Sequence, residues 1–157
     1  MKKYLLIFSI FVFITGLTSC KKSNDAAAAA AVQAAYDDAA IQTYMQQNNI
    51  TATKDPSGLY YSIITPGTGP YPTSTSNVSI NYTGKYLNGL VVFETNPSEY
   101  VPLPGTILGW QIGIPHINDG GTILLLVPSA LGYGPGGTPT VPANAVLIFN
   151  ITLQGFN

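Results

Sequence analysis

The sequence predicts an α+β fold: an antiparallel sheet of five to six strands wrapped around one short α-helix, preceded by an N-terminal helix. Short apolar or alternating segments, separated by turns rich in Gly and Pro, are typical of antiparallel strands. The segment 106–117 has apolar residues at helical spacing and contains the only Trp of the chain. A run rich in Ala, the strongest helix former, precedes every expected strand.

The composition limits the classes of partner. Only 8% of the 157 residues are charged, the formal net charge is −1, and the chain contains no Arg. Surfaces that bind nucleic acid need clusters of Lys and Arg to neutralise phosphates, so we expect no nucleic-acid partner. The length fits one domain with an extension.

The N-terminus has the pattern of an export signal. Lys2 and Lys3 precede an uncharged apolar run, 4–17, that is too short for a comfortable membrane span. The following Leu17-Thr18-Ser19-Cys20 resembles the lipobox of bacterial lipoproteins, which implies a signal peptide over 1–19 and acylation of Cys20. We therefore expect a lipid-anchored protein on a membrane of the cell envelope, facing the periplasm. The alternative is an ordinary secretory signal followed by a chance Cys.

Residues 20–57 are expected to connect the lipid to the domain. We interpret 21–24 as a solvated tether and Asp25 as the N-cap of an Ala-rich helix that ends at Asn48 and Asn49. Tyr36 and Tyr44 share one face of that helix. The helix is interpreted as a spacer, with a dimerising arm as the alternative.

The domain is expected to span 58–157, and alternation predicts its strands. The clearest is 78–83, where Val78, Ile80 and Tyr82 would face a dry core. The segment 122–127 is apolar throughout, as in a central strand covered on both faces. Further strands are predicted at 59–64, 90–93 and 145–153, with a turn at 84–89 and loops at 94–105 and 128–142.

The short helix is predicted from Trp110, Ile114 and Ile117, whose spacings of four and three turn all three side chains to one side. Gly113 and Pro115 keep the helix short. A Trp in this position is either a core residue or the floor of a ligand site. These residues alone leave both interpretations open.

Several short motifs follow one another in a fixed order: Tyr82-Thr83-Gly84-Lys85, Val92-Phe93-Glu94, Gly109-Trp110, Gly120-Gly121, Gly132-Tyr133-Gly134, and Val141-Pro142-Ala143-Asn144-Ala145 with Leu147-Ile148-Phe149. Together they resemble the FK506-binding-protein (FKBP) family of peptidyl-prolyl cis-trans isomerases. The resemblance extends from about Gly58 to Leu153. Each motif is weak by itself, and their order and spacing make the resemblance specific.

The resemblance implies an FKBP-like fold with an apolar pocket. Carried over position by position, the catalytic residues are Tyr82, Phe93, Glu94, Trp110, Tyr133 and Phe149, and the substrate-binding residues are Ile107, Val141 and either Tyr100 or Val101. Glu94 stands where the family usually has Asp, and Thr106 stands where it has Val. The loop after Glu94 is shorter than in familiar members of the family.

The implied activity is that of a rotamase assisting the folding of exported proteins. Rotation about an X-Pro bond breaks no covalent bond, and its barrier of roughly 18–20 kcal/mol is mainly lost amide resonance. A dry aromatic pocket can favour the twisted amide, so we expect no cofactor and no metal. The expected partners are proline-containing polypeptides and macrolide inhibitors of the FK506 type. The alternative is a peptide-binding or chaperone module without turnover on the same fold.

Other chemistries find few suitable residues. His116 is the only His, so a metal cluster or a His-based triad lacks partners. Asp37 and Asp38 are interpreted as a solvated helix face and not as a catalytic pair. The Gly-rich segment 134–137 lacks the Lys of a phosphate-binding loop.

Overall fold

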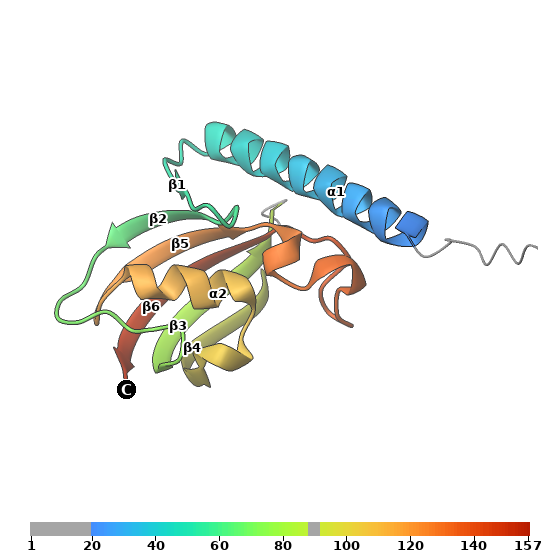
Figure 1. Cartoon of the computed structure of the whole chain (residues 1–157). Coiled ribbons are helices and arrows are strands. Elements are labelled where there is room, and N and C mark those ends of the chain that lie inside the picture. The colour runs from blue at the N-terminus through green and yellow to red at the C-terminus, as the bar shows by residue number, and fades with distance from the viewer. Residues whose placement is uncertain (1–19, 88–91) are drawn as a thin grey trace, which may run out of the picture.

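The computed structural model describes residues 20–87 and 92–157, with side chains for 25–87, 92 and 100–157. Figure 1 shows a sheet with one short helix against it and one long helix beside it. The elements are α1 (Cys20–Gln47), β1 (Thr53–Lys54), β2 (Tyr60–Thr65), β3 (Asn77–Tyr86), β4 (Val92–Pro102), α2 (Leu108–Gly113), β5 (Thr122–Val127) and β6 (Leu147–Phe156). The predicted α+β class is confirmed. The predicted signal peptide, 1–19, lies outside the described residues.

The six strands form one antiparallel sheet in the order β1-β2-β5-β6-β3-β4. The last strand in sequence, β6, lies inside the sheet, where Phe149 pairs with Leu125 of β5 on one side and with Gly84 of β3 on the other. Alternate residues of β6 from Leu147 to Leu153 are buried on one face. Side chains on a strand alternate between faces, so this face forms the inner surface of the sheet.

The helix α2 packs on the inner face of the sheet. The prediction of one helix over Trp110, Ile114 and Ile117 is wrong in its extent, because α2 ends at Gly113, Ile114 begins a 3-10 turn, η2 (Ile114–His116), and Ile117 is extended. All three side chains are buried, and Ile114 and Ile117 are fully inaccessible. Gly109 and Gly113 face β5 so closely that an added Cβ would lie 2.6 Å from a Val127 methyl carbon and 2.6 Å from a Leu125 methyl carbon, respectively. The two glycines therefore let the helix lie directly on the strand, which sets the depth of Trp110.

The opposite face of the sheet is covered by α1. Ile41 is fully buried with Tyr60 of β2, Leu126 of β5 and Ile148 of β6. Since Leu125 faces α2 and Leu126 faces α1, the prediction that 122–127 is covered on both faces is correct. The spacer interpretation is wrong for this part of the helix, because its C-terminal half belongs to the folded domain.

Three expectations about α1 are wrong. The helix begins at Cys20, so 21–24 is part of the helix and not a separate tether, and Asp25 is not an N-cap. No Gly or Pro interrupts 20–25, and extending an existing helix by a turn is far easier than starting one. Asp37 is not part of a solvated face either, because only 1% of it is exposed. The helix ends at Gln47, just before Asn48 and Asn49, as expected.

The segment 94–105 was predicted as a loop, but β4 continues through it to Pro102. Proline removes a backbone donor, which excludes it from central strands but not from an edge. Because β4 is an edge strand that pairs only with β3, Pro97 and Pro102 are compatible with it. The predicted turn at 84–89 also begins later, since β3 runs to Tyr86.

No helix in the described part of the chain combines the length and the apolar character needed to cross a membrane.

Candidate active site

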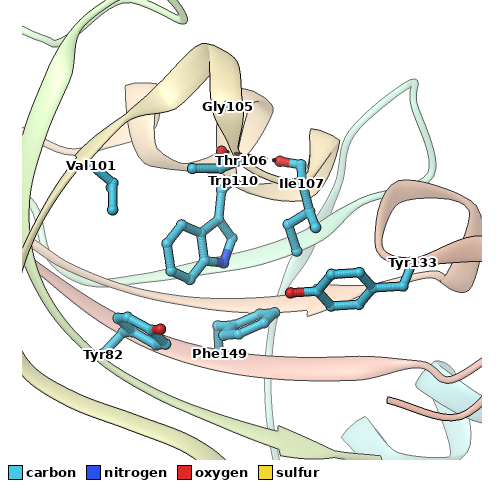
Figure 2. A pocket seen from close by; sticks show the side chains of 8 residues that line it. All are labelled: Tyr82, Val101, Gly105, Thr106, Ile107, Trp110, Tyr133 and Phe149. Carbon is cyan, nitrogen blue, oxygen red and sulfur yellow. Dashed lines mark hydrogen bonds between the residues drawn. The ribbon is translucent and has the colours of Figure 1, made fainter. Parts of the chain in front are cut away.

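A pocket of about 250 Å³ lies between α2, β3, β4, β6 and the loop that follows β5. Figure 2 shows the eight side chains that line it. They are Tyr82, Val101, Gly105, Thr106, Ile107, Trp110, Tyr133 and Phe149. Six of these were predicted as site residues, namely Tyr82, Val101, Ile107, Trp110, Tyr133 and Phe149. The fold thus gathers them from distant parts of the chain into one cavity.

Three aromatic rings form the floor of the pocket. The ring centroids of Tyr82 and Trp110 are 4.7 Å apart with an interplanar angle of 78°, and those of Trp110 and Phe149 are 5.2 Å apart at 83°. Tyr82 and Phe149 are 6.2 Å apart at 60°. Edge-to-face contacts at such distances hold the rings in defined orientations. The floor is therefore rigid and apolar, and Trp110 is both a core residue and a lining residue.

The entry to α2 supplies a backbone donor. Ile107 is the N-cap of α2 with an extended backbone (φ −63°, ψ 150°), and its carbonyl accepts a hydrogen bond from the Trp110 N–H at 3.0 Å. Within the described part of the chain, no hydrogen bond engages the Ile107 N–H. N–H groups at the start of a helix have no intrahelical partner. The Ile107 N–H can therefore serve a carbonyl of a bound peptide.

The second N–H group near the floor of the pocket is the indole N–H of Trp110. It is buried and has no hydrogen-bond partner among the described residues. Figure 2 shows the indole nitrogen on the side of the ring turned toward Phe149 and Tyr133. An N–H can make only a weak contact with an aromatic ring. The apolar part of the floor is therefore supplied by the carbon atoms of the indole and of its two neighbouring rings, Tyr82 and Phe149.

Tyr133 reaches the pocket from the loop between β5 and β6. The loop contains a short 3-10 helix, η3 (Ser129–Leu131), and is braced by hydrogen bonds from the Gly137 N–H to the Tyr133 carbonyl (3.2 Å) and from the Asn144 N–H to the Gly134 carbonyl (2.9 Å). In Figure 2 the Tyr133 hydroxyl points toward the space between Ile107 and Phe149. The loop thus places a polar group at the edge of an apolar cavity.

Val101 and Thr106 form the remaining wall. Val101 pairs with Val78 in the β3–β4 ladder, so both side chains face inward. The Thr106 hydroxyl donates to the Leu103 carbonyl at 2.8 Å, which directs its hydrogen away from the pocket. Gly105 and Thr106 were not predicted as site residues. Their position directly before Ile107, in the turn that enters α2, could have identified them as lining residues.

Four predicted site residues do not appear in the lining. Val141 is 3% exposed and packs in the core, where its backbone hydrogen-bonds to Thr138. Tyr100 pairs with Ser79 and is 60% exposed, so it lies on the face away from the pocket. Phe93 and Glu94 belong to β4, and their side chains lie outside the described part of the structure.

The described lining contains no carboxylate, imidazole, amine or thiol. Its ionisable side chains are the phenols of Tyr82 and Tyr133, while the side chain of the predicted pocket carboxylate, Glu94, lies outside the described residues. The described part of the lining is therefore mainly apolar and aromatic. It suits the binding of a neutral apolar group whose flanking carbonyls need a few hydrogen-bond donors.

Comparison with known proteins agrees with this geometry. Residues 69–154, more than half of the chain, match the sequence model of the family described as FKBP-type peptidyl-prolyl cis-trans isomerase. The chain belongs to this FKBP family. The chain is 35% identical to FkpA of Escherichia coli over 101 residues, which are 62% of this chain and 37% of FkpA. It is 33% identical to Mip of Coxiella burnetii over 101 residues, which are 62% of this chain and 44% of Mip.

Two solved structures support the same fold. The crystal structure of FkpA from Escherichia coli superposes with a TM-score of 0.70 at 28% identity, covering 87% of this chain and 68% of that one. A peptidyl-prolyl cis-trans isomerase from Pseudomonas syringae gives a TM-score of 0.66 at 25% identity, covering 74% of this chain and 90% of that one. In the sequence comparison, the chain matches less than half the length of the curated relatives, 37% of FkpA and 44% of Mip.

Proposed function

We propose that this FKBP domain accelerates cis-trans rotation about X-Pro bonds. The observation that carries the proposal is the single cavity in which Trp110, Tyr82 and Phe149 form an apolar floor beside the Ile107 N–H and the Tyr133 hydroxyl. A volume of about 250 Å³ lies below the roughly 300–1,000 Å³ typical of drug-sized ligands. It suits a proline ring with its flanking amides.

The proposed mechanism is preferential binding of the twisted amide. Planar amides are polar and well hydrated, whereas a twisted amide has a nearly single C–N bond and a less dipolar carbonyl. A water-poor aromatic cavity disfavours the planar form relative to the twisted one, and the two donors hold the flanking carbonyls in place. Each tenfold of rate needs about 1.4 kcal/mol of such differential binding.

The proposal is tested with a protease-independent isomerisation assay on a proline tetrapeptide. Trp110→Leu, which removes the floor, is expected to lower kcat/KM at least about tenfold, equivalent to about 1.4 kcal/mol. Tyr71→Ala is the matched control, because Tyr71 is 60% exposed and does not line the pocket. Phe149→Ala serves as a second pocket variant, and circular dichroism checks that each variant is folded. Wild-type protein that binds the peptide without turnover would leave only the peptide-binding alternative.

The substrates are proposed to be proline-containing segments of exported proteins, and macrolides of the FK506 type are proposed as inhibitors. Both proposals follow from family membership and from the apolar lining. Inhibition of the tetrapeptide assay by such a macrolide, lost in Trp110→Leu, supports one common site. Turnover unaffected by the macrolide in the wild type would separate catalysis from macrolide binding.

The chain is further proposed to be a lipoprotein of the bacterial cell envelope, anchored through Cys20. The support is the sequence pattern of 1–20 and the bacterial source of FkpA and Mip. Several acyl chains anchor a protein stably, whereas a single chain does so only marginally. Replacing Cys20 by Ser is expected to move the protein from the membrane fraction to the aqueous fraction. Retention in the membrane would point to an uncleaved signal instead.

A further inference from the structure

We propose that Asp37 on α1 is a positioning residue for the pocket, because it holds the turn that carries Tyr133. The inference rests on the proposed isomerase function and adds to it a part of the chain outside the matched family segment, 69–154. It gives α1 a role in substrate recognition at a distance from the cavity.

The contact is a buried carboxylate satisfied by three neutral donors. One Asp37 oxygen, Oδ2, accepts from the Ser129 N–H at 2.8 Å and from the Ser129 hydroxyl at 2.6 Å. The other, Oδ1, accepts from the Gln33 side-chain amide at 2.8 Å. Asp37 is 1% exposed and Ser129 is 2% exposed. Among the described residues, no cation lies within ion-pair distance of Asp37.

Asp37 does for η3 what a local N-cap would normally do. Ser129 is the first residue of η3, and its N–H has no partner within the turn. The preceding residue, Pro128, provides no side-chain cap. The acceptor comes instead from α1, 92 residues earlier in the chain. Without Asp37 the buried Ser129 N–H would lack an acceptor, and the turn would have to move to find one.

The turn held by Asp37 leads directly to the pocket. The Gly132 N–H closes η3 by donating to the Ser129 carbonyl at 3.1 Å, and Tyr133 follows immediately. An added Cβ at Gly132 would lie 3.3 Å from a Leu147 methyl carbon, so the segment has little room to shift. If Ser129 moves, its hydrogen bond moves Gly132, and the backbone of Tyr133 has to follow.

The hydrogen bonds of Asp37 are not the only contacts that attach α1 to the rest of the domain. Ile41 already anchors the helix in a buried cluster on the outer face of the sheet. Asp38 anchors it a second time, by accepting from Lys54 and from the Tyr60 hydroxyl. Burying a carboxylate is costly unless its hydrogen bonds are complete. Of these three anchors, Asp37 is the one that hydrogen-bonds to the loop of Tyr133, which points to positioning as its role.

The test uses the full chain and compares Asp37→Ala with Asp38→Ala. Asp37→Ala is expected to lower kcat/KM on the proline tetrapeptide by up to about tenfold, which is what one neutral hydrogen bond to the substrate contributes. Asp38→Ala cuts the neighbouring attachment of the same helix and should leave kcat/KM unchanged. Asp37→Asn keeps an oxygen for Ser129 and should restore part of the loss. Equal losses in the two Ala variants would mean that general loosening of α1 is responsible, which would overturn the inference.

A double-mutant cycle with Tyr133→Phe separates positioning from stability. If Asp37 acts through the Tyr133 hydroxyl, Asp37→Ala costs less than about twofold in kcat/KM once that hydroxyl is absent, although its effect on stability persists. A full further loss in the Tyr133→Phe background would refute the route through Tyr133.

A second readout does not depend on catalysis. In amide NMR spectra, Asp37→Ala should shift the Tyr133 and Gly134 resonances, whereas Asp38→Ala should leave them in place. Unshifted Tyr133 resonances in Asp37→Ala would overturn the inference even if the wild-type protein is active. An inactive wild type would instead count against the isomerase function, and the spectra would still test the structural connection.

Discussion

Trp110 lies at its depth in the pocket because two glycines on α2 face the sheet. Gly109 is in contact with Val127, and Gly113 with Leu125. Leu125 can rotate its terminal methyls, but Val127 is β-branched and has little freedom at χ1. Of the two glycines, Gly109 is therefore the one that tolerates a larger side chain less well.

Gly109→Ala is predicted to destabilise the domain. Overpacking costs about 1–3 kcal/mol, and the better helix propensity of Ala returns at most about 1 kcal/mol. Urea denaturation should thus show a net loss of up to about 2 kcal/mol in the free energy of unfolding if Ala returns its full helix propensity. Gly136→Ala is the control, since an added Cβ there meets no atom within 4 Å. Equal stability of the two variants would show that the close approach of α2 to β5 is not required.

Glu94→Ala is predicted to lower kcat/KM several-fold without abolishing turnover. The β3–β4 and β3–β6 registers place the Glu94 backbone in one row with Gly84 and Phe149, next to the pocket floor. The expected role of the carboxylate is to orient a neighbouring group, and X-Pro rotation needs no proton transfer. The tetrapeptide assay measures the change, with Glu94→Asp as the variant that restores the residue usual in the family. Complete loss of turnover in a folded Glu94→Ala protein would contradict this role.

At the scale of elements, α1 functions as a part of the domain. The family match covers 69–154, yet Ile41 is fully buried against Tyr60, Leu126 and Ile148. Val32, which lies earlier in the same helix, is 72% exposed. The helix therefore has a half that packs and a half that remains at the surface.

Ile41→Ala is predicted to destabilise the domain by about 2–5 kcal/mol, as expected for truncation of a buried aliphatic side chain. Val32→Ala, on the same helix but exposed, should change the free energy of unfolding by less than about 0.5 kcal/mol. Thermal or urea unfolding of both variants makes the comparison. An Ile41→Ala protein as stable as the wild type would mean that the packing of α1 on the sheet does not contribute to the free energy of unfolding.

The strands with clear alternation could be predicted from the sequence, and the edge strand could not. Val78, Ile80 and Tyr82 face the core because a dry face imposes a period of two. In β4, prolines suggested a loop, and only its place at the edge of the sheet makes them compatible with a strand.

The position of β4 in the sheet also limited the prediction of the candidate site. Tyr100 and Val101 are neighbours in sequence, and a shift of one residue in register exchanges their faces. The register of β4 depends on irregularities near Tyr82 and Lys85 in its pairing with β3, which the sequence does not reveal. Trp110, Phe149 and Tyr133 could be located because short motifs carry them. The burial of Asp37 could not be predicted, because its partner Ser129 is remote in sequence.

At the scale of the whole molecule, a few carboxylates link stability to pH. Hydrogen bonding from Lys54, followed by that from Tyr60, lowers the pKa of Asp38 below its ordinary 3.8. The Ser57 hydroxyl and N–H lower the pKa of Asp55 in the same way. A carboxyl with a lowered pKa stabilises the folded state above the pKa of its unfolded form, and this contribution disappears as the pH falls through the folded pKa.

Stability is therefore predicted to decrease when the pH falls below about 4, and Asp38→Asn should flatten that decrease. Urea denaturation at several pH values between 2.5 and 6, roughly the range in which carboxylates titrate, gives the slope. Asp25→Asn, an exposed change on the same helix, is the charge-matched control. An unchanged acid slope in Asp38→Asn would show that the contact with Lys54 does not contribute.

The position of β6 determines when the molecule can begin to work. This strand joins the β1-β2-β5 half of the sheet to the β3-β4 half and carries Phe149, yet it follows every other strand along the chain. A nascent chain that has not yet released residues 147–156 therefore has two unconnected sheet fragments and a pocket that lacks Phe149. The pocket is complete only once β6 has paired with β5 on one side and with β3 on the other.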